Sequence, residues 1–451
     1  MRKSTVGLAL AGLTSCGGGG SSSTDMHLQT LPTLIMAFVD TQNHKQVISG
    51  DLEIRQTRRE PLLLNGPATL TVSLGSQDIV EQTITSLPTT ISIPESSLNT
   101  ALVDRLLVKL ESEQFINVQQ AVRFFDASGE IEVQGPGGNA KQAWLYGIER
   151  PSLRVTRRGN HCYLNNGIVA VIDMQNTTDP QSSPMAANRI DDDTYQPYNF
   201  DCSASTYHAQ KSISDSGGIW TYSTLNDALY YGTIVHNMFV HYLGEPPLDH
   251  QIRLRVHYGP RSSVRAFWDG AYANFSDAYP FQYSTASLDI IAHEVAHGVL
   301  LRLSSMSYTT PLGLDAQTLS EAFSDLSGVM AKHWLDPTTN LWWHGEETDG
   351  SIRKLNQIQT ESAAVSSYLD YATAGNNPYL RIGLITYPFY LLSQKWGVES
   401  TYQVYIDATR CWTPESTLID GARCIVSSAG QLGYPTSDVY EAFDAVNMPL
   451  L

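Results

Sequence analysis

The residues best suited to do chemistry are two histidines and a glutamate in residues 293–297, HEVAH. Residues four apart on a helix lie on the same face, so His293 and His297 would present their imidazoles side by side. Two neutral imidazoles can bind one zinc ion, and Glu294 between them can remove a proton from a water molecule. This pattern predicts a zinc-dependent hydrolytic site. The alternative is a pair of ordinary histidines on a half-buried helix.

A zinc ion in a hydrolytic site takes three protein ligands, so a third ligand is expected downstream. Residues 320–325 (SEAFSD) are predicted to open a second helix, on which Glu321 and Asp325 share a face. One carboxylate can bind the metal while the other accepts the N–H of a ligand histidine and fixes its tautomer. A solvated acidic helix face is the alternative interpretation of these two residues.

HEVAH followed by SEAFSD resembles the thermolysin–vibriolysin group of zinc metallopeptidases. The resemblance covers about residues 155–451 and includes the motifs LNDA (225–228), VHYG (256–259), RAFWDG (265–270) and YEAFDAVN (440–447). It implies an α+β fold with a β-rich half, a central active-site helix and an α-helical C-terminal half. It also implies one zinc ion as cofactor and proteins or peptides as substrates.

The resemblance implies a role for individual residues. His293, His297 and Glu321 would bind zinc, with Glu294 as the base and Asp325 as the partner of His293. The family places a tyrosine that stabilises the oxyanion eleven residues after the second histidine, which here is Tyr308. The positions that match substrate contacts are Ala266, Arg353, Ile290 and Ile352, with Phe281 as a further apolar wall position.

Three positions depart from the family pattern. Arg265 stands where the family has an asparagine that binds the substrate backbone, and Tyr379 stands where it has a histidine that donates to the oxyanion. Ala374 replaces the aspartate that supports that histidine. A phenol is neutral at pH 7 and can donate, so Tyr379 is predicted to be a catalytic residue that faces the cleft. Loss of one oxyanion donor typically costs on the order of 100- to 1000-fold in rate. A catalytically impaired scaffold that binds proteins at the cell surface is therefore the second hypothesis.

The family also binds calcium behind the active site. Asp289 and Glu346 match two of its carboxylate ligands, but the third position is Lys332. An ammonium beside two carboxylates would replace the ion electrostatically, so calcium is not expected.

Composition limits the classes of partner. The chain has 451 residues and a net charge of −17, which argues against nucleic acid and against electrostatic attachment to anionic lipid. A chain of this length is expected to form two or three domains, and no stretch is long enough to span a bilayer.

The N-terminal residues are predicted to direct export. Residues 1–15 have the positive start and short apolar run of a signal peptide, and Leu13–Cys16 resembles the bacterial lipobox. Cys16 would then be lipidated, and residues 16–26, rich in glycine and serine, would form a flexible tether. Gly17 after the cysteine suggests an outer-membrane lipoprotein of a Gram-negative cell envelope, periplasmic or surface-facing, or released outside the cell. An ordinary secretory peptide is the alternative.

Four cysteines remain after Cys16, and an even number in an exported protein implies disulfides. The resemblance suggests the pairs Cys162–Cys202 and Cys411–Cys424.

Alternating polar and apolar residues in 69–74, 83–85 and 90–93 predict a β-sandwich-like accessory module over residues 27–134. Residues 135–138 (GPGG) are predicted to be a linker. The β-rich half of the peptidase would occupy residues 139–290, and the active-site helix and α-helical half would occupy 291–451.

Overall fold

The fold is described from a computed structural model. It describes residues 130–450 apart from 182–194, 209–212, 216–217, 305, 307–311 and 351, and in the preceding part of the chain the strands β1 to β8. Cys16 and the predicted tether lie outside the described residues. Within the described part of the chain, no helix is long and apolar enough to cross a membrane.

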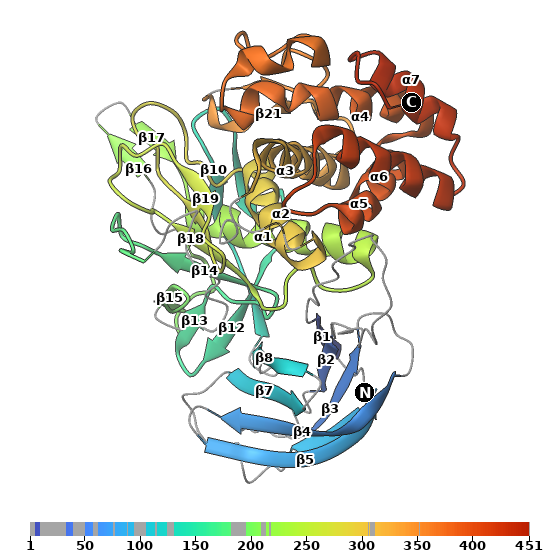
Figure 1. Cartoon of the computed structure of the whole chain (residues 1–451). Helices are drawn as coiled ribbons and strands as arrows, with labels where there is room; N and C mark the ends of the chain where they lie inside the picture. The colour runs from blue at the N-terminus through green and yellow to red at the C-terminus, as the bar shows by residue number, and fades with distance from the viewer. Residues whose placement is uncertain are drawn as a thin grey trace.

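The N-terminal strands form two four-stranded sheets (Figure 1). One has the order β1-β2-β3-β6 and the other β5-β4-β7-β8. Their bounds are β1 Thr5–Ala9, β2 Thr33–Phe38, β3 Gly50–Gln56, β4 Leu62–Leu74, β5 Gln77–Leu87, β6 Thr89–Ile93, β7 Arg105–Ser112 and β8 Phe115–Arg123. The segments predicted as strands from their alternation lie in β4, β5 and β6. In β4, Ala68, Leu70 and Val72 are fully buried, as expected for residues two apart on one face of a sheet.

Strand β1 lies within the predicted signal peptide. It pairs antiparallel with β2 and occupies the edge of its sheet. Removal of residues 1–15 would therefore leave the pairing of β2, β3 and β6 intact.

The part of the chain from residue 130 combines two further four-stranded sheets with three hairpins. The sheets have the orders β15-β13-β12-β9, which is antiparallel, and β14-β18-β20-β19, in which β14, β18 and β20 are parallel and β19 is an antiparallel edge strand. The hairpins are β10-β11, β16-β17 and β21-β22. The bounds are β9 Glu130–Val133, β10 Gly135–Gly138, β11 Ala143–Tyr146, β12 Leu153–Arg158, β13 His161–Tyr163, β14 Val169–Asp173, β15 Asn199–Asp201, β16 Ile213–Asp215, β17 Gly218–Thr221, β18 Ile252–Val256, β19 Ala266–Trp268, β20 Ala273–Phe275, β21 Trp343–His344 and β22 Arg353–Lys354.

The prediction that residues 135–138 are a linker is wrong. They form β10, which pairs with β11 and is largely buried. A Cβ on Gly137 would lie 2.3 Å from Trp144 Nε1 and 2.4 Å from Asp227 Oδ1, so glycine is required there for close packing rather than for flexibility. Strand β9, which ends at Val133, pairs with β12, so the sheet of the β-rich half begins before residue 134.

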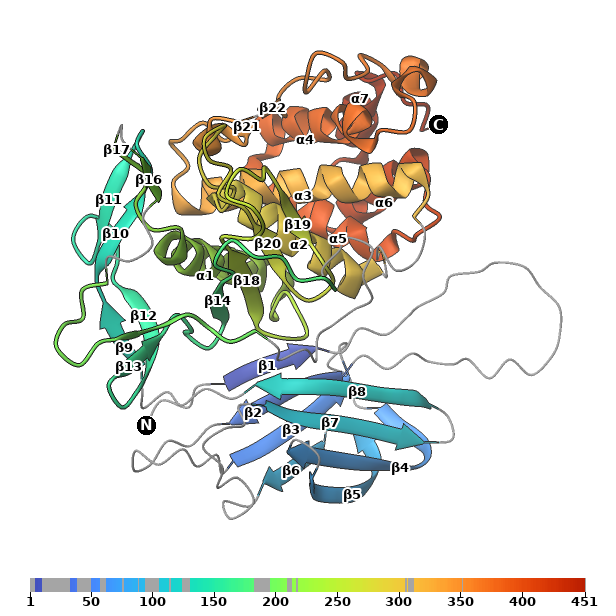
Figure 2. The same cartoon turned by 90° about the vertical axis from the view of Figure 1, so that its left-hand side faces the viewer.

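Seven α-helices and several 3₁₀ turns complete the described chain. The helices are α1 Thr224–Leu243, α2 Leu288–Ser304, α3 Leu314–Leu335, α4 Gly383–Trp396, α5 Val398–Ala408, α6 Leu418–Gln431 and α7 Thr436–Asp444, and the turns are η3 Glu346–Thr348, η4 Tyr368–Ala374, η5 Pro378–Arg381 and η6 Thr409–Cys411. In Figures 1 and 2, α2 and α3 lie between the sheets on one side and helices α4 to α7 on the other.

Three predicted helix boundaries differ from the structure. The active-site helix begins at Leu288, before the boundary placed between residues 290 and 291. The second helix begins at Leu314, six residues before Ser320. The helix expected to begin near Leu380 is instead a 3₁₀ turn, η5, which contains Tyr379 and is followed by α4.

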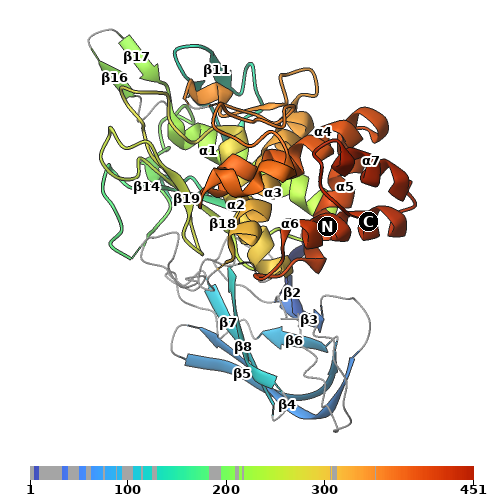
Figure 3. The same ribbon diagram turned by 45° about the horizontal axis from the view of Figure 1, so that its top comes forward.

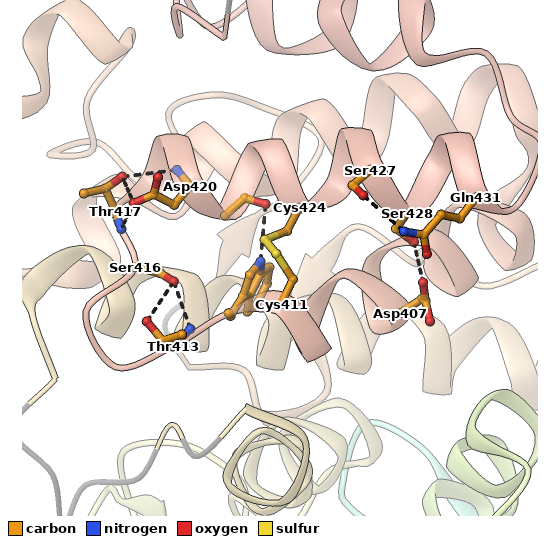
Figure 4. The surroundings of a disulfide bond; sticks show 12 residues. Asp407, Cys411, Thr413, Ser416, Thr417, Asp420, Cys424, Ser427, Ser428 and Gln431 are labelled. Atoms are coloured by element: carbon orange, nitrogen blue, oxygen red, sulfur yellow. Dashed lines mark hydrogen bonds between the residues drawn. A yellow bond between two sulfur atoms is a disulfide. The ribbon is translucent and has the colours of Figure 1, made fainter. Parts of the chain in front are cut away.

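Both expected disulfides are present in the structure. Cys162–Cys202 joins β13 to the loop after β15, and Cys411–Cys424 joins η6 to α6. Figure 4 shows the second disulfide together with the reciprocal capping bonds between Thr417 and Asp420 at the start of α6. Closing a loop of 13 residues stabilises a fold by about 3 kcal/mol in the chain-entropy estimate.

Candidate zinc site

Two neighbouring helices carry the candidate zinc ligands. His293 and His297 lie four residues apart on α2, and Glu321 lies on α3, which packs along α2 (Figure 3). All three side chains are at least 90% buried. The apolar residues around them, such as Ile291, fix the two helices within one hydrophobic core.

The three ligand atoms converge on one point. His293 Nε2 lies 3.2 Å from His297 Nε2 and 3.1 Å from Glu321 Oε2, and His297 Nε2 lies 3.7 Å from the same oxygen. Tetrahedral ligands at zinc bond lengths are about 3.3 Å apart. The donor set and its spacing therefore fit one zinc ion.

Each ligand histidine has a partner on its other ring nitrogen. His293 Nδ1 lies 2.8 Å from Asp325 Oδ1, and His297 Nδ1 lies 3.0 Å from Ser320 Oγ and 3.3 Å from Ser324 Oγ. Such partners fix the tautomer in which Nε2 is free to bind metal. Asp325 is thus where the sequence predicted it, whereas the serine partners of His297 were not predicted.

The charges of these groups are strongly coupled. Burial opposes protonation of His293, but hydrogen bonds with Asp325 and Glu321 raise its pKa to about 10. Burial lowers the pKa of His297 to about 4. Burial would raise the pKa of Glu321, yet the charge of His297 and the hydrogen bond from His293 lower it to about 2. The carboxylates of Asp325 and Glu321 therefore place negative charge around His293, where a zinc ion would supply positive charge.

Glu294 lies beside the ligands. Its carboxyl oxygen and the ring nitrogens of His293 and His297 lie within 4.8 Å of one another. Burial raises the pKa of Glu294 to about 7, although the charge of His293 and a hydrogen bond from the Trp268 backbone lower it. A carboxyl group with this pKa can accept and return a proton near neutral pH.

Strand β19, whose Trp268 backbone is hydrogen-bonded to this carboxyl group, also contains Ala266. Ser276 N donates to Arg265 O and Asp269 N donates to Tyr272 O. Antiparallel pairs alternate between hydrogen-bonded and non-hydrogen-bonded, so the N–H and C=O groups of Ala266 point away from β20 toward the open edge. The Arg265 side chain is exposed, and its guanidinium lies 4.9 Å from the centre of the Phe267 ring.

Arg353 and Tyr379 both face the ligands. Arg353 donates two hydrogen bonds to Asp325, Nε to Oδ2 at 2.7 Å and a terminal nitrogen to Oδ1 at 2.6 Å. Its guanidinium lies 5.2 Å from the centre of the Tyr379 ring. Burial and the nearby carboxylate of Glu321, with which the phenol forms a hydrogen bond, raise the pKa of Tyr379 well above its usual value. The phenol is therefore a neutral donor, and it is directed at a zinc ligand.

The remaining predicted site residues lie in different surroundings. Ile290 and Ile352 are half-buried, and Ala374 is buried in η4. Phe281, predicted as a pocket wall, is 70% exposed. Tyr308 lies outside the described residues.

Lys332 lies behind the active-site helix, where the family resemblance implied calcium. Its ammonium donates to Trp343 O at 3.1 Å. Burial opposes ionisation of Asp289, but the charges of His344 and Lys332 lower its pKa. Burial and the charge of Asp289 raise the pKa of Glu347 in spite of Lys332. Asp289 already accepts hydrogen bonds from Ser287 Oγ, Ile290 N and Gly345 N. Calcium needs six to eight oxygen ligands. A site with an ammonium among its carboxylates does not fit that ion.

Sequence patterns missed one buried residue beside the site. His344 is 4% exposed, and its ring centre lies 5.4 Å from that of His293. It comes 47 residues after His297 in a two-residue strand, so no local periodicity could have indicated it.

Two family models match the chain. The model described as "Thermolysin metallopeptidase, catalytic domain" matches residues 140–301, and the one described as "Thermolysin metallopeptidase, alpha-helical domain" matches residues 313–448. The first contains His293, Glu294 and His297, and the second contains Glu321 and Asp325.

Curated relatives agree with these matches. A "Neutral protease" of Vibrio proteolyticus is 30% identical over 322 residues, which are 70% of this chain and 49% of the relative. A "Hemagglutinin/proteinase" of Vibrio cholerae is 28% identical over 76% of this chain and 58% of the relative, and a "Zinc metalloproteinase MspA" of Legionella longbeachae is 28% identical over 70% and 59%. The chain thus spans about half the length of the curated relatives it matches. With both family models matched in order around a complete set of zinc ligands, the chain belongs to the thermolysin family of zinc metallopeptidases.

Proposed function

We propose that this chain is a zinc-dependent endopeptidase that hydrolyses peptide bonds of proteins. The observation that carries the proposal is the convergence of His293, His297 and Glu321 at zinc-ligand spacing, with the Glu294 carboxyl beside them. A protein that only bound partners would have no need of a buried base at this position.

Zinc, when bound, polarises the substrate carbonyl and lowers the pKa of a water molecule. Glu294 accepts the proton from the attacking water and delivers it to the leaving amine, a role suited to a carboxyl group with a pKa near neutrality. Asp325 and Ser320 hold the ligand histidines in the required tautomer. Tyr379 and, by family resemblance, Tyr308 supply neutral donors for the oxyanion.

An extended peptide is the substrate that suits the edge of the sheet. The N–H and C=O groups of Ala266 point away from β20, and they can pair with a peptide backbone as an added strand. They belong to the strand whose Trp268 backbone is hydrogen-bonded to Glu294. Arg353, held by Asp325, would contact a substrate carbonyl. Ile290 and Ile352 would contact the side chain that follows the scissile bond.

A second candidate is a protein-binding surface lipoprotein with an impaired active site. The observation in its favour is that the Tyr379 phenol is hydrogen-bonded to Glu321 and so is already engaged. Arg265, in place of the asparagine of the family, also favours it. Turnover measurements separate the two candidates.

We further propose that the chain is anchored in the cell envelope through a lipid on Cys16. The lipobox-like residues before Cys16 support this proposal. The two N-terminal sheets would then form a β-sandwich-like module between the lipid and the peptidase, which would serve as a spacer, a binding domain or a reduced prodomain.

The proposal is tested by digestion of casein with purified protein before and after chelation. Hydrolysis should stop when zinc is removed and return when about one equivalent is added. Equal hydrolysis with and without zinc would overturn the proposal. A fully zinc-loaded protein that hydrolyses nothing would favour the scaffold candidate.

A further inference from the structure

His344 is a buried histidine with no place in the proposed mechanism, yet it faces the zinc site. It is paired with Arg353 across the β21-β22 hairpin. Cross-strand partners present their side chains on the same face, so the hairpin delivers both residues to one place. Both side chains lie against the Asp325 carboxylate. Arg353 donates to it at 2.6 and 2.7 Å, and His344 Nε2 lies 3.5 Å from its Oδ1.

The imidazole lies between two carboxylates on different helices. Asp325 on α3 faces Nε2, and Asp289 in the first turn of α2 faces Nδ1, with 3.9 Å between Nδ1 and Asp289 Oδ2. Asp289 is supplied with donors by Ser287, Ile290 and Gly345. Burial lowers the pKa of His344 to about 4, so the neutral ring carries one N–H. The shorter distance favours that N–H on Nε2, toward Asp325.

The neighbouring helix leaves space for this ring. Gly328 lies one turn after Asp325 on α3, and a Cβ there would lie 3.0 Å from His344 Nδ1 and 3.0 Å from Asp289 O. Such distances are tighter than most real Cβ contacts. A glycine at this point therefore admits the imidazole to the space between α2 and α3.

We infer that His344 is a positioning residue of the zinc site, which holds the Asp325 carboxylate so that Asp325 directs His293 toward the metal. The contacts form a continuous series, because Asp325 Oδ1 also lies 2.8 Å from His293 Nδ1. His344 would touch neither substrate nor metal. This inference rests on the proposed zinc-dependent function, and its main readout is metal affinity rather than turnover.

The test compares two substitutions with a matched control. His344→Leu fills similar space without a donor, whereas His344→Gln retains an N–H close to the position of Nε2. Loss of an outer partner of a zinc ligand typically costs about 10- to 100-fold in metal affinity or activity. We expect His344→Leu to raise the zinc Kd by about 10-fold, at the low end of that range, and to lower kcat with KM unchanged. His344→Gln should recover most of the affinity.

Zinc Kd is measured by competition with a chromophoric chelator, alongside thermal unfolding of each apo protein. His208→Leu is the control, because His208 is also buried, 2% exposed, but is stacked on Phe200 away from the metal ligands. It should lose stability and keep the wild-type zinc Kd. Gly328→Ala, which crowds the imidazole, should weaken zinc binding even if His344→Leu does not fold.

Wild-type zinc Kd in His344→Leu and in Gly328→Ala would overturn the inference. So would an equal loss of affinity in His344→Leu and His344→Gln, because the donor would then be irrelevant. Absence of zinc binding in the wild type would overturn this inference and the proposed function together. Zinc binding without hydrolysis would overturn only the proposed function, since the Kd comparison would still apply.

Discussion

At the scale of single residues, the two ligand histidines differ in the charge of their hydrogen-bond partners. His293 is held between two carboxylates, whereas His297 is held by serine hydroxyls. The partner at Nδ1 is therefore an anionic carboxylate for His293 and a neutral hydroxyl for His297. An anionic partner makes an imidazole a more basic ligand, so His293 should be the stronger donor to zinc.

Tyr379 is the proposed oxyanion donor that lies beside the zinc ligand Glu321. We predict that Tyr379→Phe lowers kcat on the order of 100-fold and changes KM much less, because a donor to the oxyanion acts only in the transition state. Steady-state kinetics on a peptide substrate measure both constants. Tyr390→Phe is the control, since Tyr390 on α4 packs against Trp342. If Tyr379→Phe leaves both constants unchanged, the phenol is only a partner of Glu321.

At the scale of secondary-structure elements, the β10-β11 hairpin supports the start of α1. Gly138 N and the Tyr146 hydroxyl both donate to Asp227, a buried carboxylate in the first turn of α1. Burial raises the pKa of Asp227 to about 7 in spite of these donors. This junction is tightly packed and tolerates no added atom near Gly137.

We predict that Gly137→Ala destabilises the fold by about 1–3 kcal/mol, the usual cost of overpacking, because its Cβ would collide with Trp144 and Asp227. Urea unfolding measures the change. The control is Gly430→Ala, an exposed position near the end of α6 where alanine favours the helix. Equal stability of Gly137→Ala and the wild type would show that the hairpin is not packed as described.

The elements also show what a sequence can reveal. HEVAH and SEAFSD each lie within one helix, so spacing along the chain was enough to predict which side chains share a face. The ligand set, Asp325 and both disulfides could be anticipated for that reason or from family resemblance. The GPGG segment was misread because glycine serves close packing as well as flexibility. His344 and Gly328 meet only through tertiary packing between a short hairpin and α3, which leaves no local pattern.

At the scale of the whole molecule, the Lys332 ammonium lies behind α2, where the family resemblance implied calcium. A cavity of about 330 Å³ at that point is lined by residues that include Asp289, Lys332, Glu346 and Glu347. We predict that calcium is dispensable, because the Lys332 ammonium already offsets the neighbouring carboxylates.

Thermal unfolding of the zinc-loaded protein with calcium or with a calcium-selective chelator measures this. The wild type should show the same melting temperature in both, whereas Lys332→Glu should become less stable and be rescued by calcium. Lys332→Gln is the control, which should lose stability without calcium rescue. A large fall in the wild-type melting temperature on calcium chelation, with zinc retained, would contradict the prediction.

The proposed lipid on Cys16 would attach the whole molecule to the cell envelope. We predict that the wild type partitions with membranes and that Cys16→Ser is released or left unprocessed, because one lipidated cysteine is the attachment point. Fractionation and mass spectrometry of the N-terminal peptide measure the difference. Identical partitioning of wild type and Cys16→Ser would exclude this anchor.

We propose above that this chain is a zinc peptidase in which Glu294 is the base. The most direct test of this proposal is a comparison of wild type and Glu294→Gln for zinc content and for hydrolysis of a peptide library. The substitution keeps the size of the side chain and removes the group that accepts the proton. We predict about one zinc per chain in both proteins, hydrolysis by the wild type, and a loss of at least about 1000-fold in Glu294→Gln. Equal hydrolysis by the two proteins, or a folded wild type without zinc, would contradict it.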